Sequence, residues 1–430
     1  MRQPARLAVE SVARESRARL LAFLAARAHD VAAAEDALSD AFRSALERWP
    51  HDGVPDVPEA WLLTAARCRL IDATRHSQVQ SESAPGLIAA VEDAQSLLDE
   101  EQAFPDERLK LMFVCAHPAI DAAARTPLML QTVLGLDAAR IASAFLVKPA
   151  AMGQRLSRVK TKIRGAGIAF EIPRVQDLPE RLDAVLQAVY AAYGSGWDDV
   201  AGADPRRKGL AAEALELGAL LVRLMPGEPE ALGLSELMLY CESRRDARRN
   251  EAGEYVPLSE QDVSRWSMPM IKQADRLLRD AGHMRRPGRF QLEAAIQCAH
   301  AQRAQGGEID WNAIATLYEG LVRISPTIGA QIGRAAAIAQ ACDAHSGWKL
   351  LQEIPADAVA TYQPYWALAA HLLARMQRGD EARAARERAI GLCDDAAMRR
   401  FLMKSRHRGL HRIDRAETPD AGVEDPRDID

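Results

Sequence analysis

The sequence predicts an all-α protein. Aromatic residues make up only 5% of the 430 residues, whereas alanine and leucine recur throughout, and this composition favours packed helices over β-sandwiches. Apolar side chains recur with helical spacing along almost the whole chain, and no segment shows the apolar–polar alternation of a half-buried strand. At about 100–200 residues per domain, the length predicts roughly two to four helical domains.

Composition also indicates the cellular compartment in which the protein is expected. Hydrophobic residues account for 48% and charged residues for 27%, and no uninterrupted apolar run of 18 residues occurs, which argues against a membrane-spanning helix. The N-terminal stretch lacks the continuous apolar segment of a secretory signal. Six cysteines lie far apart in mostly helical patterns, which is typical of reduced thiols in a protein core. We therefore expect a cytoplasmic protein with no membrane partner.

Residues 5–76 predict a bundle of three helices, over 7–28, 31–49 and 59–75. A His-Asp pair separates the first two helices. A segment bounded by two prolines separates the last two, because proline fits poorly inside a helix. We expect these three helices to pack as one domain.

Charge changes sharply after this bundle. Residues 77–104 form a linker rich in Ser, Gln and Glu, with a weak helical pattern over 87–98. Between 77 and 107 there are eight acidic residues and no Lys or Arg, whereas 108–175 carries 11 basic residues against three acidic ones. A compact basic block, which we place at 105–170, behind an acidic linker suggests a module that binds a polyanion.

The strongest local pattern lies at residues 135–167. Asp137 can cap a short helix, and after a tight turn Pro149 fits the first turn of a longer one. Four apolar residues of the longer helix share one stripe that must pack inward: Met152, Leu156, Val159 and Ile163. The remaining surface presents the predicted DNA-binding residues: Ala151, Gln154, Arg155, Arg158, Lys160 and Lys162. This pattern favours a helix-turn-helix whose second helix enters the major groove; a solvated basic helix is the alternative.

A second nucleic-acid pattern lies on the helix predicted at 59–75. One face combines an aromatic ring with a hydroxyl and basic groups: Trp61, Thr64, Arg67 and Arg75. An exposed ring beside arginines suits an unpaired base next to phosphates. On composition alone, an amphipathic helix in which Trp61 closes the edge of a core is at least as good an interpretation.

The other polar patterns give no catalytic constellation. Asp36 and Asp40 lie one helical turn apart with Phe42 nearby, but no third ligand accompanies them, so a protein-docking face or a solvated face is favoured over a metal site. Cys115 and His117 lack a second ligand pair, which favours local packing over zinc. Phosphate-binding loops, dinucleotide fingerprints and hydrolase motifs are absent from the sequence. We expect neither a cofactor nor an enzymatic activity.

Residues 178–411 contain pairs of predicted helices. Small residues between 366 and 389 fit the 34-residue spacing of tetratricopeptide repeats, and weaker pairs lie at 295–326 and 215–241. A generic helical bundle is the alternative. The tail at 412–430 is acidic and rich in residues that disfavour order, so we expect it to be disordered.

Taken together, these motifs resemble the bacterial extracytoplasmic-function sigma factors, in the group that carries a long C-terminal extension with tetratricopeptide repeats. AEDALSDAFRSAL resembles sigma region 2.2, which contacts RNA polymerase. PEAWLLTAARCRLID resembles regions 2.3–2.4, which melt and read the −10 promoter element, and GLDAARIASAFLVKPAAMGQRLSRVKTKIR resembles region 4.2, which reads the −35 element. Segments such as EALGLSELMLYCESRRDAR resemble the extension of this group. The likeness covers about residues 8–405.

The resemblance implies a sigma factor that directs core RNA polymerase to promoter DNA. Residues 5–76 would be sigma region 2, docking on polymerase through Asp36, Asp40 and Phe42, and residues 105–170 would be sigma region 4. The extension would bind a peptide or protein ligand, pack near region 4 and gate it. Two alternatives stay open: a sigma-derived DNA-binding regulator that no longer engages polymerase, and a repeat scaffold whose basic helix is incidental.

Overall fold

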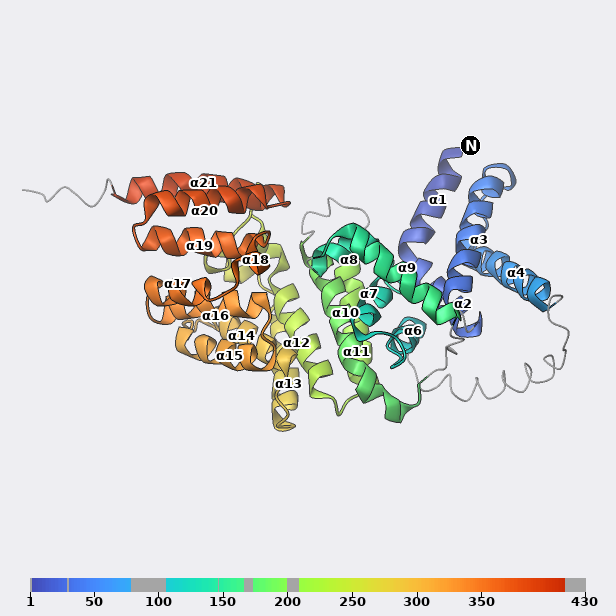
Figure 1. Cartoon of the computed structure of the whole chain (residues 1–430), viewed down its shortest axis with the longest axis horizontal. Helices are drawn as coiled ribbons and strands as arrows, with labels where there is room; N and C mark the ends of the chain where they lie inside the picture. Colours follow the sequence, from blue (N-terminus) through green and yellow to red (C-terminus); the bar gives the residue numbers. More distant parts are fainter. Residues whose placement is uncertain are drawn as a thin grey trace, which may run out of the picture. The chain divides into compact units, whose positions relative to one another are not determined.

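The computed structural model describes residues 2–28, 31–78, 106–145, 147–165, 173–198 and 209–413. Figure 1 draws their helices in chain order. Among these residues every named element is an α-helix or a 3-10 helix, and the only β-type pairing is an isolated antiparallel bridge between Arg249 and Tyr255. The all-α prediction is therefore confirmed. The predicted helix at 87–98 and most of the predicted linker and tail lie outside the described residues.

Contacts within the chain divide it into two compact units. The first comprises residues 1–239 and 273–291, and the second comprises 240–272 and 292–430. The division falls inside the segment that the sequence presented as one extension, because helix α12 begins in the first unit and ends in the second. The first part of the extension thus clusters with the N-terminal helices.

The first four helices are α1 (Arg2–Glu15), α2 (Arg17–Ala28), α3 (Val31–Asp52) and α4 (Pro58–Gln78). They pack around leucines that are almost completely buried: Leu21, Leu24, Leu38 and Leu62. The single helix predicted at 7–28 is wrong, because it is divided at Ser16. The buried Ser16 hydroxyl donates to Glu59 of α4 over 3.1 Å, and this contact with a distant helix leaves no periodic signal.

Four further helices follow: α6 (Glu107–Cys115), α7 (Ala122–Thr132), α8 (Ala138–Ala144) and α9 (Pro149–Gly165). The first three begin after an aspartate whose carboxylate accepts a backbone N–H of the first turn: Asp106, Asp121 and Asp137. Helices α6 and α7 are buried on most sides, which requires cover from further elements. Helices α2 and α9 supply part of that cover, and α10 (Leu178–Asp198) and α11 (Leu210–Leu224) supply the rest.

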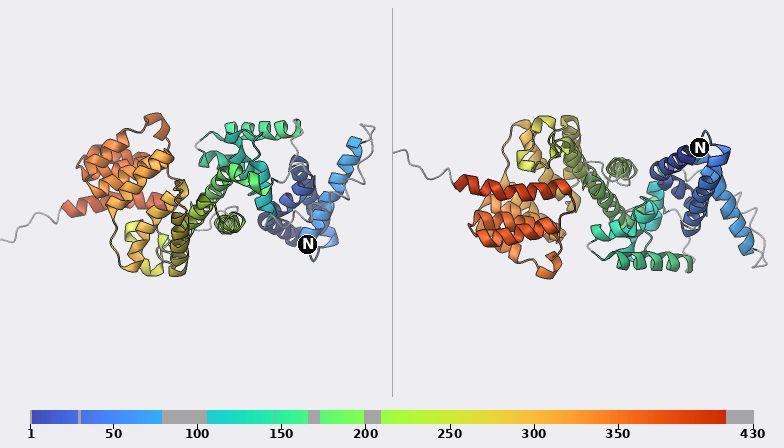
Figure 2. Two further views of the ribbon diagram at one scale, coloured as in Figure 1. Left: turned by 90° about the horizontal axis from the view of Figure 1, so that it is seen from below. Right: turned by 90° about the horizontal axis from the view of Figure 1, so that it is seen from above.

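Helix α12 (Pro229–Ser243) runs from the first unit into the second, whereas most of α13 (Met268–His283) belongs to the first. Three helix pairs follow in the second unit: α14 (Arg289–Ala301) with α15 (Trp311–Ile324), α16 (Ile328–Ala341) with α17 (Ala344–Gln352), and α19 (Gln363–Arg375) with α20 (Gly379–Gly391). The short α18 (Ala356–Val359) precedes the last pair, and α21 (Ala396–Ile413) lies beside α20 in Figures 1 and 2.

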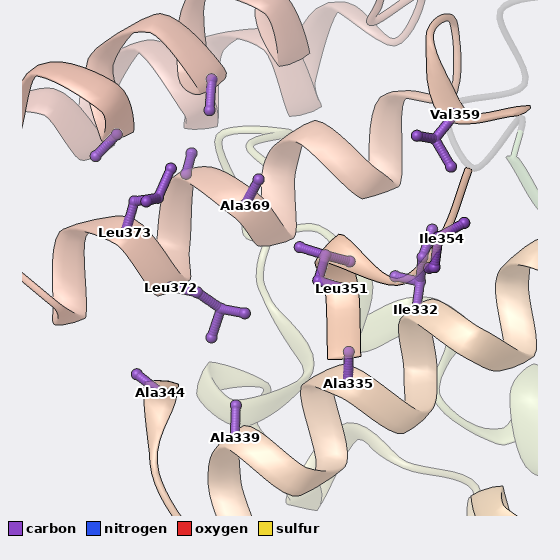
Figure 3. Close-up of a cluster of buried hydrophobic side chains, with 13 residues drawn as sticks. Ile332, Ala335, Ala339, Ala344, Leu351, Ile354, Val359, Ala369, Leu372 and Leu373 are labelled. Atoms are coloured by element: carbon purple, nitrogen blue, oxygen red, sulfur yellow. The ribbon is translucent and has the colours of Figure 1, made fainter. Parts of the chain in front are cut away.

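Small residues let these helices pack closely. Figure 3 shows the core shared by α16, α17 and α19, where Leu351, Leu372 and Ala335 are completely buried. A Cβ added at Gly347 would lie 2.5 Å from the Cβ of Ala339, so any larger residue would force α16 and α17 apart. The helix pair expected at 366–389 is present as α19 and α20, with Ala369, Ala382 and Ala385 buried in the same core.

The described residues contain no helix that is both long and apolar enough to cross a membrane. All six cysteines are free thiols. Cys115 and Cys393 are buried as expected, but Cys68 and Cys342 are exposed, so the prediction of core positions is wrong for these two. Cys68 lies on the solvent side of α4, and Cys342 directly follows the end of α16.

Candidate nucleic-acid interface

Helices α8 and α9 are joined by a short turn whose ends are set by local hydrogen bonds. Asp137 Oδ1 accepts the backbone N–H of Arg140 over 3.0 Å, which begins α8 as the sequence predicted. Helix α9 begins at Pro149, also as predicted. Three of the four expected inward residues, Met152, Leu156 and Ile163, are buried, while Val159 is half-buried. The apolar stripe therefore fixes which face of α9 meets solvent.

The exposed face of α9 carries most of the residues predicted to contact DNA. Ala151, Gln154, Arg158 and Lys162 are exposed. Lys148, at the start of the helix, is exposed as well and was not among the predicted residues. Its position just before Pro149, where a helix N-terminus faces solvent, is the signal that could have identified it. This face offers several cations and an amide to a polyanion.

Two of the predicted DNA-binding residues already have partners. Arg155 is half-buried, and its Nη1 donates to the carbonyl oxygen of Ala123 over 3.5 Å. Lys160 Nζ donates to Glu35 Oε2 of α3 over 2.5 Å. Sequence periodicity cannot show such pairs, because the residues that form them are far apart in the chain.

The face predicted on α4 is only partly open. Trp61 is half-buried and meets Trp49 of α3 edge-on, with ring centroids 5.5 Å apart. Thr64 and Arg67 are exposed, although the Thr64 hydroxyl donates to the carbonyl oxygen of Ala60. The side chain of Arg75 lies outside the described residues. Trp61 therefore both closes a core edge and keeps part of its ring accessible for stacking.

The residues predicted to meet a protein partner lie along α3. Asp36 is exposed, and Phe42 is half-buried. Asp40 is partly exposed and forms an ion pair with Arg43 at 2.8 Å. Asp36 and Asp40 lie one helical turn apart on one face of α3, and Phe42 offers a partly apolar surface elsewhere on the same helix. This arrangement suits docking of a basic or mixed protein surface.

Helices α10 and α11 cover the side of the module formed by α6 and α7. Thr126 of α7 donates its hydroxyl to the carbonyl oxygen of Ala184 over 3.3 Å, and Arg181 donates to the carbonyl oxygen of Phe113 over 3.2 Å. The apolar residues that α10 buries include Leu178, Leu182, Val185, Leu186 and Val189. The prediction that the extension packs near residues 105–170 is confirmed for these two helices.

A buried arginine ties α11 to the start of α6. Arg108 is 6% exposed, and its guanidinium donates to Asp106, Glu213 and Glu216 at 2.9–3.0 Å. Burial alone lowers the pKa of Arg108, but the hydrogen bonds that it donates to Asp106 and Glu216 outweigh burial, so the pKa is raised and the charge is retained. Burial raises the pKa of Glu213 despite this arginine.

Cys115 and His117 take part in helix-end packing. Burial raises the pKa of the Cys115 thiol to about 12, and Thr132 Oγ1 is its hydrogen-bonding neighbour at 3.9 Å. His117 Nδ1 accepts the backbone N–H of Ala119 over 3.1 Å. Across the described residues, no group of three or more His, Cys, Asp or Glu side chains is arranged to hold a metal ion.

Comparisons with known proteins place relatives along most of the chain. Residues 181–282, which span most of α10 to α13, match the family of unknown function DUF6596. Over 373 residues the chain is 36% identical to the uncharacterized protein R00370 of Rhizobium meliloti (strain 1021), an alignment that covers 86% of this chain and 88% of the relative. No solved structure matches the chain significantly.

Proposed function

The chain belongs to the same family as the Rhizobium meliloti protein, and we propose that it is a sigma factor that directs core RNA polymerase to promoters. The observation that carries this proposal is the α8–α9 pair. Its second helix buries one apolar stripe and leaves Gln154, Arg158 and Lys162 exposed, which is the geometry of a helix that reads the major groove.

The first four helices supply the complementary functions. In this proposal α3 docks on polymerase through Asp36, Asp40 and Phe42, and the accessible part of Trp61 stacks on an unpaired base of the −10 element. The protein performs no catalysis itself and acts where the DNA is, in the cytoplasm. Helices α14–α20 form a repeat-like array that binds a peptide or protein ligand.

In vitro transcription tests the proposal. Full-length protein with core polymerase should initiate at a defined subset of a promoter library, and polymerase alone should not. The variant Arg155→Ala/Arg158→Ala/Lys162→Ala should lose promoter affinity by about 10–100-fold at ~0.15 M salt and keep its helix content, because the apolar stripe holds the fold.

A matched control removes three exposed cations of the second unit, Arg323→Ala/Lys349→Ala/Arg383→Ala, and should leave promoter affinity unchanged. Undiminished affinity in the α9 variant would refute the role of that helix. Sequence-specific DNA binding without polymerase binding would favour the sigma-derived regulator instead. DNA affinity that ignores salt would favour the repeat scaffold, because phosphate contacts weaken as salt rises.

A further inference from the structure

One carboxylate, that of Glu35, links the helix proposed to bind polymerase with the helix proposed to bind DNA. Glu35 lies on α3, the helix proposed to dock on polymerase, and contacts Lys160 on α9, the helix proposed to read DNA, at 2.5 Å. The other oxygen of Glu35 lies 3.5 Å from Arg17 Nη2 on α2. The Glu35 and Lys160 side chains are only 20% and 22% exposed. This degree of burial strengthens their attraction relative to a surface ion pair.

The surrounding contacts hold the same two parts together. Helix α2 packs against α6, so the N-terminal bundle and the α6–α9 module touch within the first unit. Arg17 Nη1 lies 3.9 Å from the position that a Cβ would take at Gly135, in the turn that leads to α8. Arg17 therefore approaches this turn while its guanidinium also faces Glu35. The ion pair lies within a wider contact between the two parts.

The Glu35–Lys160 ion pair opposes DNA binding for electrostatic reasons. A lysine whose ammonium donates to a carboxylate has lost most of its attraction for a phosphate. The Glu35 carboxylate also places a negative charge beside the face that DNA would approach. A phosphate backbone could engage α9 fully only after Glu35 and Lys160 separate.

We propose that Glu35 is a latch that holds Lys160 and thereby restrains DNA binding by α9 until a partner engages α3. This inference rests on the proposed function, since it assigns DNA to α9. Asp36, the next residue, is exposed, so a partner could dock on the same turn of α3 that carries the latch. Docking there and release of Lys160 would then be coupled through one helix.

The direct test compares full-length protein with its Glu35→Gln variant, which keeps the side-chain shape and removes the charge. Affinity for a promoter duplex and for an unrelated duplex is measured by fluorescence anisotropy at ~0.15 M salt. Glu35→Gln should bind both duplexes about 3–10-fold more tightly, because a released lysine contacts phosphate whatever the sequence.

Two controls separate the latch from a general charge effect. Glu10→Gln changes the net charge equally and breaks the Arg6–Glu10 pair (2.9 Å) within α1, so it should leave affinity unchanged. In a Lys160→Gln background, adding Glu35→Gln should give a clearly smaller gain, because no lysine remains to be released and only the repulsion by the carboxylate is lost. A gain of the same size in either control would overturn the proposal.

Cross-linking tests the contact without DNA. A zero-length carbodiimide should join Glu35 to Lys160 in the free protein, and mass spectrometry of the digest should identify the linked peptides. Bound core polymerase should lower the yield. Absence of the link in the free protein, or equal DNA affinity of wild type and Glu35→Gln, would refute the latch alone. If no variant binds any duplex, the proposed function fails and the latch fails with it.

Discussion

Glu236 on α12 makes the folded protein less stable at neutral pH than it would be with an uncharged residue there. The side chain is 0% exposed, and neither carboxylate oxygen has a hydrogen-bond partner. Burial, with smaller contributions from Glu230 and Asp280, raises the pKa of Glu236 from its ordinary value of 4.5 to about 8. At pH 7 the folded protein therefore keeps this carboxyl protonated, whereas the unfolded chain ionises it.

The size of this effect follows from proton linkage. A pKa raised on folding gives stability that is complete below the ordinary value and is lost as pH rises toward the folded value. Between 4.5 and pH 7 there are about 2.5 pH units, each worth about 1.4 kcal/mol, so about 3 kcal/mol is lost by pH 7. At pH 5 the loss is less than about 1 kcal/mol.

Glu236→Gln keeps the shape and cannot ionise, so it should be up to about 3 kcal/mol more stable than wild type at pH 7 and nearly equal at pH 5. Urea unfolding followed by circular dichroism at both pH values measures this difference. Glu47→Gln, an exposed residue of α3, serves as the control and should change little at either pH. Equal stability of wild type and Glu236→Gln at pH 7 would show that the carboxyl is ionised in the folded protein and that the reasoning from burial fails.

Three further outcomes are expected. Asp36→Lys/Asp40→Lys should abolish polymerase binding in a pull-down. It should lower the free energy of unfolding by less than ~1 kcal/mol, since both carboxylates lie at the surface. An unfolded variant would show that these carboxylates are structural. Arg108→Met should destabilise the first unit by about 1–3 kcal/mol in denaturant unfolding, because it leaves the partly buried carboxylates of Asp106 and Glu213 without their hydrogen-bond donor. An unchanged midpoint would contradict this. Truncation after Pro173 removes α10 and α11, which cover the apolar surfaces of α6 and α7. The truncated protein should therefore aggregate or show a lowered helix content per residue by circular dichroism. A soluble, fully helical product would contradict this.

Local features of the fold could be predicted from the sequence. Asp137 and Pro149 mark the starts of α8 and α9, and the spacing of Met152 and Leu156 identifies the buried face of α9. These signals work because capping, proline geometry and helical periodicity all act within a few residues. The α19–α20 pair was foreseen for the same reason, from its regularly spaced small residues.

The contacts that join the modules could not be predicted in this way. Arg108 and Glu213 are 105 residues apart, and Lys160 and Glu35 are 125 apart. Each of these residues fits a charged helix face in its own segment, and nothing local distinguishes a charge that will be buried from one that stays in water. The candidate site was thus predictable as a set of faces on α3, α4 and α9. The partner of Lys160 required the folded chain.

The packing of α10 also decides which experiment can separate regulation from folding. The extension was expected to gate the DNA-reading module, and truncation is the obvious test of that idea. However, α10 contributes Leu182, Val185 and Val189 to the core that it shares with α6 and α7, so a truncated protein loses part of the module itself. Its failure in transcription would say nothing about gating. Glu35→Gln leaves every one of these apolar contacts in place, so a change in its DNA affinity reports on restraint of α9 and not on the integrity of the domain.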